Sequence, residues 1–122
     1  MSKLALVVED DPPLRKMVRG YLELQKYDVA EASDGRKAMA ALREQKFDLL
    51  VLDLMLPESS GYDVLEFIRA EGMTSTPVLM MSARSLPEDR AHAEELGARL
   101  YLIKPFTRAE FTRAVRAVTE GP

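Results

Sequence analysis

Five short apolar runs, separated by longer amphipathic segments, constrain the fold of this chain more than any other feature. In four of the five runs the apolar residues are consecutive rather than alternate, and in the run Val29–Ala32 only Glu31 interrupts them. Consecutive apolar residues are typical of parallel strands covered by helices on both faces. The runs are Leu4–Val8, Val29–Ala32, Leu49–Leu52, Val78–Met81 and Leu100–Ile103. We therefore predict an α/β fold in which five strands alternate with five helices through right-handed crossovers.

Helical periodicity and capping signals occupy the segments between the runs. Residues 14–22 and 111–118 place apolar side chains at the i, i+3, i+4 and i+7 spacing of an amphipathic helix. Asp11 before Pro12 is typical of a helix N-cap followed by proline at the first helical position. Gly97 fits a helix end before the fifth strand. Two pairs match the S/T-x-x-E capping box, namely Ser85 with Glu88 and Thr107 with Glu110.

The composition excludes several classes of function. With 122 residues, of which 47% are hydrophobic, the chain has the size of one domain with a single core. It has no cysteine and one histidine, which excludes disulfides, thiolate metal sites, cysteine nucleophiles and multi-histidine metal sites. A net charge of −3 gives no electrostatic reason to expect nucleic acid as a partner. Since the chain also shows no membrane-length apolar run and no signal peptide, we expect a soluble, cytoplasmic domain over residues 1–122.

The carboxyl ends of the predicted strands carry a concentrated set of charges, and ligands of open α/β sheets bind outside those ends. Glu9 and Asp10 follow the first run, Asp53 the third, Ser82 the fourth and Lys104 the fifth. The three carboxylates and the ammonium sum to −2, which is costly in a cleft unless a carboxylate pKa rises or a cation binds. Oxygen ligands favour a hard divalent ion, so we predict Mg²⁺.

The reactive role falls on Asp53, because its carboxylate ends the middle strand and should point into the cleft. A carboxylate can act as a nucleophile toward a phosphoryl donor and form an aspartyl phosphate. In this interpretation Asp10 and Asp53 supply oxygens to the metal. Glu9 contributes through a bound water or by contacting the ligating residues, without binding the metal itself. Lys104 binds the phosphoryl charge, and Ser82 donates a hydrogen bond to the phosphoryl oxygens.

These residues and their neighbours resemble the motifs of bacterial two-component response-regulator receiver domains. The matching segments run through nearly the whole chain in the right order, so that together they are far more specific than any one of them. They are Val7 to Asp11, Asp48 to Asp53, Pro57 with Gly61, Met81-Ser82-Ala83, and Tyr101 to Phe106. The resemblance implies a flavodoxin-like, doubly wound sheet of strand order 2-1-3-4-5 with five helices.

The resemblance also implies a reaction and its partners. Asp53 would accept a phosphoryl group from a sensor histidine kinase or a phosphotransfer protein. Asp10, Asp53 and the backbone carbonyl of Met55 would ligate Mg²⁺, with Glu9 in support, and Lys104 would bind the phosphoryl group. The domain would then catalyse its own phosphorylation and slow dephosphorylation, without being a turnover enzyme.

A switch and an output surface follow from the same resemblance. Ser82 and Tyr101 would form the switch pair, in which the hydroxyl moves toward the phosphoryl group and the ring turns inward. The change would reach the face made by the fourth helix, fifth strand and fifth helix, which would bind an output protein or effector domain. A cis peptide before Pro105 is also implied. Arg99 and Leu100 replace the acidic pair of one large subfamily, which argues against that subfamily's salt-bridged dimer and leaves a homodimer open.

Other functions remain open on the sequence alone. A phosphohydrolase would use Asp53 as a turnover nucleophile, although Met55 stands where an acid/base aspartate would be wanted. A degenerate receiver would bind its partner independently of phosphate. DNA binding by the basic last helix ranks lowest, because no separate helix-turn-helix segment is present, and we expect neither nucleic acid nor membrane as a partner. Asp11 is interpreted as a helix cap rather than a metal ligand, and His92 as a solvated side chain.

Overall fold

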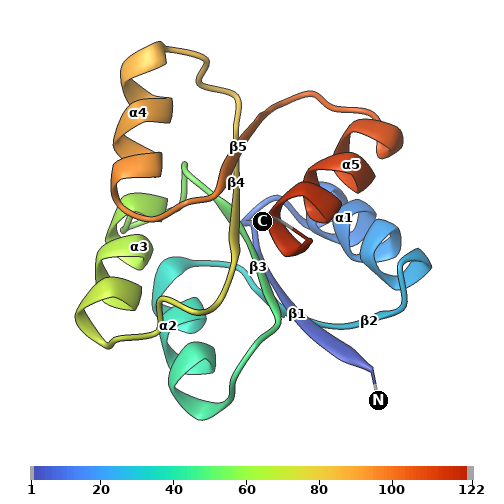
Figure 1. The fold of residues 1–122 in the computed structure, drawn as a ribbon, viewed down its shortest axis with the longest axis horizontal. Helices are drawn as coiled ribbons and strands as arrows, with labels where there is room; N and C mark the ends of the chain where they lie inside the picture. The colour runs from blue at the N-terminus through green and yellow to red at the C-terminus, as the bar shows by residue number, and fades with distance from the viewer. Residues whose placement is uncertain (1, 121–122) are drawn as a thin grey trace.

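A five-stranded parallel sheet forms the middle layer of the computed structural model, which describes residues 2–120 (Figure 1). The strands are β1 (Lys3–Val8), β2 (Tyr27–Ala32), β3 (Leu49–Asp53), β4 (Val78–Ser82) and β5 (Leu100–Ile103). They lie in the order β2-β1-β3-β4-β5. The helices are α1 (Pro12–Leu24), α2 (Gly35–Glu44), α3 (Gly61–Ala70), α4 (Pro87–Glu95) and α5 (Arg108–Thr119). The predicted class, number of elements and strand order are confirmed.

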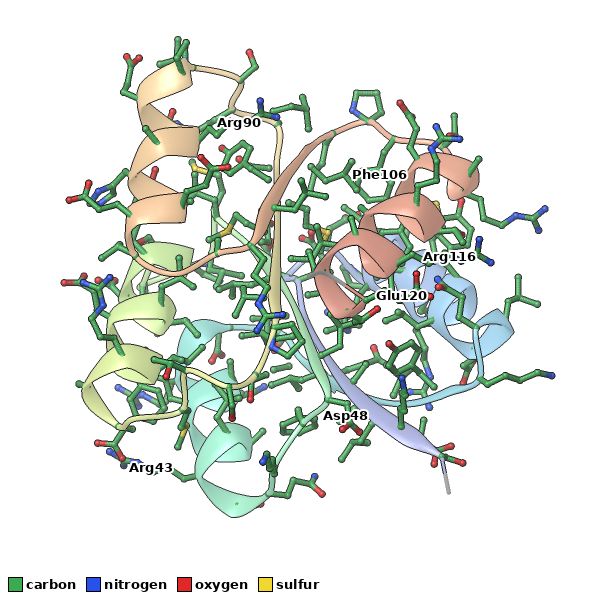
Figure 2. The ribbon with its side chains drawn as sticks, in the orientation of Figure 1. Arg43, Asp48, Arg90, Phe106, Arg116 and Glu120 are labelled. Atoms are coloured by element: carbon green, nitrogen blue, oxygen red, sulfur yellow. The ribbon has the colours of Figure 1, made fainter. Side chains whose placement is uncertain are left out.

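Both faces of the sheet are covered, and successive residues of the central strands pack into different cores. Leu50 and Leu52 face the core shared with α2, α3 and α4, whereas Leu49 and Val51 face the core shared with α1 and α5. Every residue of β3 and β4 is buried. Two covered faces require apolar side chains at consecutive positions, which is the pattern read from the sequence. Figure 2 shows the side chains that fill both layers.

Two central strands extend one residue beyond their apolar runs, and in both cases the added residue is polar. Asp53 ends β3 and Ser82 ends β4, and both continue the parallel ladders of the sheet. Backbone pairing does not depend on side-chain polarity, so the apolar pattern ends before the strand does. At the edge of the sheet, β2 begins at Tyr27 rather than Val29, because an edge strand tolerates the exposed Asp28.

Two helix starts and one helix end follow the capping signals of the sequence. The Asp11 side chain accepts a hydrogen bond from the backbone N–H of Leu14 at 3.1 Å. At the start of α5, Thr107 and Glu110 form a reciprocal capping box. Gly97 follows α4 with a φ of +111°, a conformation that favours glycine. These three predictions are therefore confirmed.

The predicted capping box at the start of α4 is wrong. The helix begins at Pro87, its N-cap is Leu86, and no side chain caps it. Proline is best accommodated at the first helical position, where its fixed φ suits the helix and its missing N–H is not needed. This preference places the start of the helix one residue later than a cap at Ser85 would require, so Glu88 has no capping partner there.

The helices are short. The longest of them, α1, has 13 residues, whereas crossing a bilayer takes about 20 apolar residues in a helix. Within residues 2–120, no helix is both long enough and apolar enough to span a membrane.

Candidate functional site

Three carboxylates meet where β1 and β3 end side by side. Glu9 directly follows β1, Asp10 is the next residue, and Asp53 is the last residue of β3. Because β1 and β3 are paired parallel neighbours, their carboxyl ends lie at the same edge of the sheet. One carboxylate oxygen from each of the three residues lies within 4.8 Å of the others. Glu9 and Asp53 are buried, at 1% and 2% exposure, and Asp10 is exposed.

Lys104 brings one positive charge to this group. Its Nζ lies 2.7 Å from Oε1 of Glu9 and 3.2 Å from Oδ2 of Asp53. The backbone N–H of Lys104 donates to the carbonyl of Ser82 at 2.8 Å, which fixes the chain just after β5. The peptide bond between Lys104 and Pro105 is cis, as the resemblance implied. The structure thus brings together polar residues from the carboxyl ends of four strands, β1, β3, β4 and β5, as the sequence predicted.

The electrostatics of the group favour binding of a cation. Burial raises the pKa of Glu9 to about 7, and the nearby charge of Asp53 adds to the rise, while hydrogen bonds from Lys104 and from the N–H of Asp11 oppose it. Burial would lower the pKa of Lys104, but its hydrogen bond to Glu9 and the charges of Asp53 and Glu9 raise it overall. Three carboxylates against one ammonium leave an excess of negative charge, and the donor atoms are all oxygen. This set fits a hard divalent ion such as Mg²⁺, with the exposed Asp10 on the side open to solvent.

Met55 and Asp11 both donate a backbone hydrogen bond to one of the carboxylates. The backbone N–H of Met55 donates to Oδ1 of Asp53 at 3.2 Å, and its side chain is 53% exposed beside the site. Metal ligation by the carbonyl of Met55 stays a prediction. Asp11 caps α1 with its side chain and donates its N–H to Oε2 of Glu9 at 3.1 Å, as expected of a helix cap rather than a ligand.

Ser82 and Tyr101, the predicted switch pair, both bond to the backbone of Arg84. Ser82 is fully buried, and its Oγ accepts a hydrogen bond from the N–H of Arg84 at 3.0 Å. Tyr101 is 2% exposed, and its hydroxyl donates to the carbonyl of Arg84 at 2.9 Å. One residue of the loop between β4 and α4 therefore joins the two side chains.

The Arg84 side chain continues into a network that the sequence did not suggest. Its Nε donates to Oδ2 of Asp89 at 2.9 Å, and Oδ1 of Asp89 accepts a hydrogen bond from the Tyr62 hydroxyl at 2.9 Å. Arg84 holds the pKa of Asp89 below its ordinary value, whereas burial and the Asp89 carboxylate raise the pKa of Tyr62 to about 12. His92 is exposed, as expected, and meets the Tyr62 ring edge-on at a centroid distance of 4.4 Å. The bond between Tyr62 and Asp89 joins residues 27 positions apart in the chain, and such a contact leaves no local sequence signal.

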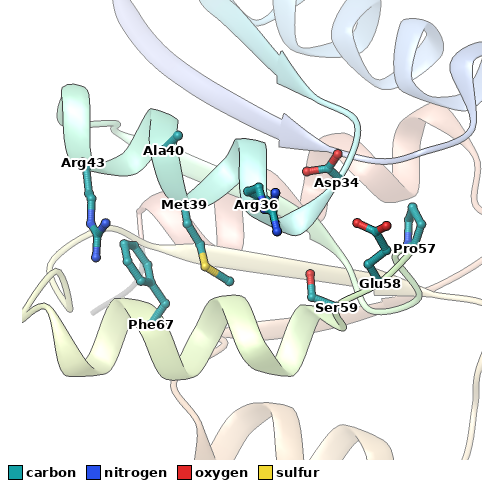
Figure 3. A pocket seen from close by; sticks show the side chains of 9 residues that line it. All are labelled: Asp34, Arg36, Met39, Ala40, Arg43, Pro57, Glu58, Ser59 and Phe67. Atoms are coloured by element: carbon teal, nitrogen blue, oxygen red, sulfur yellow. The ribbon is translucent and has the colours of Figure 1, made fainter.

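A hollow of about 440 Å³ between α2 and α3 is distinct from the acidic group (Figure 3). The Arg43 guanidinium lies 5.0 Å from the centroid of the Phe67 ring, which closes one end of it. It is lined by Asp34, Arg36, Met39, Ala40, Arg43, Pro57, Glu58, Ser59 and Phe67. The carboxylates of Glu9, Asp10 and Asp53 do not line it, so this hollow is separate from the acidic group at the sheet edge.

A five-stranded doubly wound sheet with an acidic group and a lysine at its carboxyl edge defines a class of phosphoacceptor signalling domains. The model of the response regulator receiver domain family matches residues 5–116. The chain therefore belongs to the response regulator receiver domains of two-component signal transduction.

Curated relatives of the chain are transcriptional regulators. It is 40% identical over 119 residues to the phosphate regulon transcriptional regulatory protein PhoB of Escherichia coli, covering 97% of this chain and 52% of PhoB. It is 41% identical over 113 residues to the probable transcriptional regulatory protein TcrX of Mycobacterium tuberculosis, covering 93% of this chain and 48% of TcrX. The chain thus spans about half the length of the curated relatives it matches.

Solved structures of similar shape include two bacterial proteins. The chemotaxis response regulator CheY4 of Vibrio cholerae superposes with a TM-score of 0.90 at 28% identity, covering 97% of this chain and 99% of CheY4. The receiver domain of the sensor histidine kinase PA1611 of Pseudomonas aeruginosa gives a TM-score of 0.88 at 30% identity, covering 99% of this chain and all of that domain. In that structure a magnesium ion is coordinated in the active site cleft. The acidic group of this chain resembles such a receiver magnesium site.

Proposed function

We propose that residues 1–122 act as one receiver domain that accepts a phosphoryl group on Asp53 in a Mg²⁺-dependent reaction. The donor is the phosphohistidine of a sensor histidine kinase or a phosphotransfer protein. The observation that carries the proposal is the position of Lys104, whose Nζ contacts both Glu9 and Asp53 where three carboxylates converge. With a divalent cation offsetting the remaining carboxylate charge, this ammonium can bind an incoming phosphoryl anion.

In the reaction, a carboxylate oxygen of Asp53 forms a bond to phosphorus while the bond from phosphorus to the donor nitrogen breaks. The electron pair of the broken bond stays with the imidazole of the donor. Asp10, Asp53 and the carbonyl of Met55 would hold Mg²⁺, which would supply positive charge beside the phosphoryl oxygens. Lys104 contributes a second positive charge and Ser82 donates its hydroxyl hydrogen to the new phosphoryl oxygens.

Phosphorylation then changes the surface formed by α4, β5 and α5, which binds an output protein or effector domain. Ser82 can turn its hydroxyl hydrogen toward the phosphoryl group while its Oγ still accepts from the N–H of Arg84. Any displacement of Arg84 reaches Tyr101 through the hydrogen bond to its carbonyl, and reaches α4 through Asp89. The curated relatives are transcriptional regulators, which supports an effector domain that binds DNA. That the receiver itself does not bind nucleic acid stays a prediction from its net charge of −3.

Mass spectrometry of the intact protein after incubation with acetyl phosphate tests the proposal. We expect a gain of one phosphoryl group that requires Mg²⁺ and is abolished by Asp53→Asn. The matched control is Asp28→Asn, which removes an exposed carboxylate from the edge strand β2. A phosphoryl gain retained by Asp53→Asn would overturn the assignment of the acceptor. No gain at all in a folded protein that binds Mg²⁺ would favour the degenerate binding module.

A further inference from the structure

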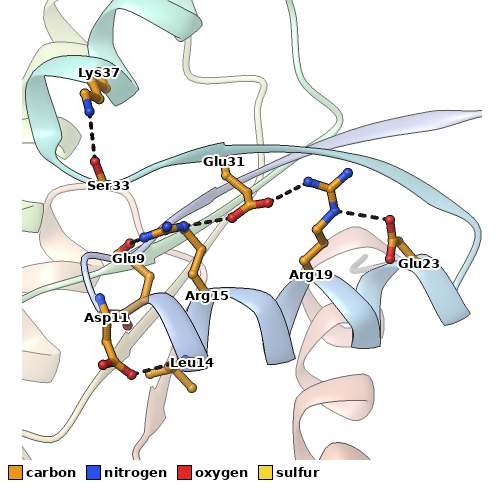
Figure 4. A network of polar contacts seen from close by, with 9 residues as sticks. All are labelled: Glu9, Asp11, Leu14, Arg15, Arg19, Glu23, Glu31, Ser33 and Lys37. Carbon is orange, nitrogen blue, oxygen red and sulfur yellow. Dashed lines mark hydrogen bonds and ion pairs between the residues drawn. The ribbon is translucent and has the colours of Figure 1, made fainter.

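Four charged side chains form a line of ion pairs along α1 and the edge strand β2 (Figure 4). Nε of Arg15 lies 2.7 Å from Oε1 of Glu31, and Nη1 of Arg19 contacts the other oxygen of the same carboxylate. Arg19 also pairs with Glu23 one turn further along α1, at 3.2 Å. The two arginines, with Arg19 the larger influence, hold the pKa of Glu31 below its ordinary value. The line therefore stays charged through the neutral pH range.

One end of this line reaches the backbone of the acidic site. Nη1 of Arg15 donates to the carbonyl oxygen of Glu9 at 2.9 Å. The ladder between β1 and β2 has its last residue pair at Val8 and Ala32, and the N–H of Glu9 still bonds to the carbonyl of Ala32 at 3.0 Å. The Glu9 carbonyl lies beyond that ladder, so the guanidinium supplies the partner that a further strand residue would have supplied.

The guanidinium is itself held in place. The Arg15 side chain is 18% exposed, and its planar fork donates to Glu31 from one nitrogen and to Glu9 from another. Lysine is a point charge on a flexible stem and does not reproduce such a fork. Arg15 thus ties the corner after β1, where Glu9 and Asp10 lie, to the neighbouring strand β2.

We propose that Arg15 is a positioning residue for the metal site, because it fixes the corner that presents Glu9 and Asp10 to Mg²⁺. The inference rests on the proposed function, which requires that ion. Arg15 contacts the backbone of Glu9 and acts on the metal through that residue. Partners that orient the ligands of a metal site typically change metal affinity about 10–100-fold when they are removed.

Charge and position predict opposite results for loss of this arginine. Removing a positive charge near a divalent cation lowers the repulsion, so charge alone predicts tighter Mg²⁺ binding after Arg15→Met. Loss of positioning frees the Glu9 corner, so our proposal predicts weaker binding. Arg19→Met is the matched control: it removes the same charge from the same network, contacts the same Glu31, and leaves the bond from Arg15 to Glu9 in place.

Calorimetric titration with MgCl₂, in the absence of any phosphodonor, measures the dissociation constant of each variant. We expect Arg15→Met to raise the Kd about tenfold, and Arg19→Met to leave it within about twofold of wild type, because its charge is more distant and screened. An Arg15→Met Kd equal to or below that of Arg19→Met would overturn the proposal. Circular dichroism before each titration identifies the variants that are folded.

Arg15→Lys keeps the charge and removes the fork, so we expect a Kd between those of wild type and Arg15→Met. If Arg15→Met does not fold, Arg15→Lys decides alone, and an unchanged Kd in that variant would overturn the proposal. A wild-type protein that binds no Mg²⁺ would overturn the proposed function together with this inference. Mg²⁺ binding that is insensitive to Arg15 would overturn this inference and leave the proposed function standing.

Discussion

Gly61 lies where α3 begins against the end of β3, and replacing it by alanine tests how tightly the site is packed. A Cβ on Gly61 would lie 2.7 Å from the carbonyl oxygen of Asp53 and 2.9 Å from Cα of Leu54. The shorter approach is about 0.7 Å less than the 3.4 Å at which ordinary contact begins. Both neighbours are backbone atoms, so no flexible side chain can move aside, and either α3 or the end of β3 must shift.

We expect Gly61→Ala to lower the free energy of unfolding by about 2–3 kcal/mol, the cost of forcing an extra carbon into a well-packed site. Gly20→Ala is the matched control, since a Cβ there meets no atom within 4 Å in the middle of α1. Alanine at Gly20 should raise the same free energy by about 0.5–1 kcal/mol, because glycine is the poorer helix former.

Urea denaturation followed by circular dichroism gives both free energies by linear extrapolation. The atoms that must move include the backbone of Asp53, so Gly61→Ala should also slow phosphorylation by acetyl phosphate, whereas Gly20→Ala should not. A Gly61→Ala protein with wild-type stability and wild-type phosphorylation rate would refute the close approach of α3 to the site.

Three further changes test other parts of the structure. Thr107→Ala should cost about 1 kcal/mol of stability in urea because it removes the α5 cap, whereas Ser85→Ala should change little, since Ser85 caps no helix. Met55→Asn should speed loss of the phosphoryl group, measured by intact mass against time, because the exposed apolar side chain beside Asp53 no longer keeps water away. Asp89→Asn should destabilise the protein more at pH 7 than at pH 3. The lowered pKa of Asp89 means that its ionised form stabilises the fold, and this contribution is lost as the pH falls below about 4. Equal losses of melting temperature at both pH values would contradict this role.

The positions of the site residues could be predicted because they depend on the topology of the sheet more than on individual side-chain contacts. Parallel strands end at a common edge, so polar residues placed directly after apolar runs must come together there. Glu9, Asp53 and Lys104 are far apart in the sequence, yet in the structure Nζ of Lys104 lies 2.7 Å from Glu9 and 3.2 Å from Asp53. The strand order itself came from the resemblance, since the apolar pattern alone does not say which strands are neighbours.

The remaining features depend on contacts that no local pattern records. The α3 cap was missed because Ser60 pairs with Asp63, whereas the capping-box pattern looks for glutamate or glutamine at that place. At α4 the proline preference outweighed a matching serine and glutamate. The hydrogen bond from Arg15 to the Glu9 carbonyl joins a helix side chain to a backbone atom. Every residue has a backbone carbonyl, so the sequence does not indicate which one Arg15 contacts.

Helix α4 buries little apolar surface, so its polar contacts with Arg84 and Tyr62 matter more for its position. The buried residues of α4 are Asp89 and Ala93, whereas α5 buries four apolar residues. Little apolar area therefore holds α4 in place, and polar contacts, among them the hydrogen bonds that Asp89 accepts from Arg84 and Tyr62, add to its attachment. The backbone N–H of Arg84 donates to Oγ of Ser82, so α4 is linked through Arg84 to the hydroxyl that we propose bonds to the phosphoryl group. We therefore expect α4 to respond to phosphorylation before α5 does, because fewer buried contacts must be broken to move it.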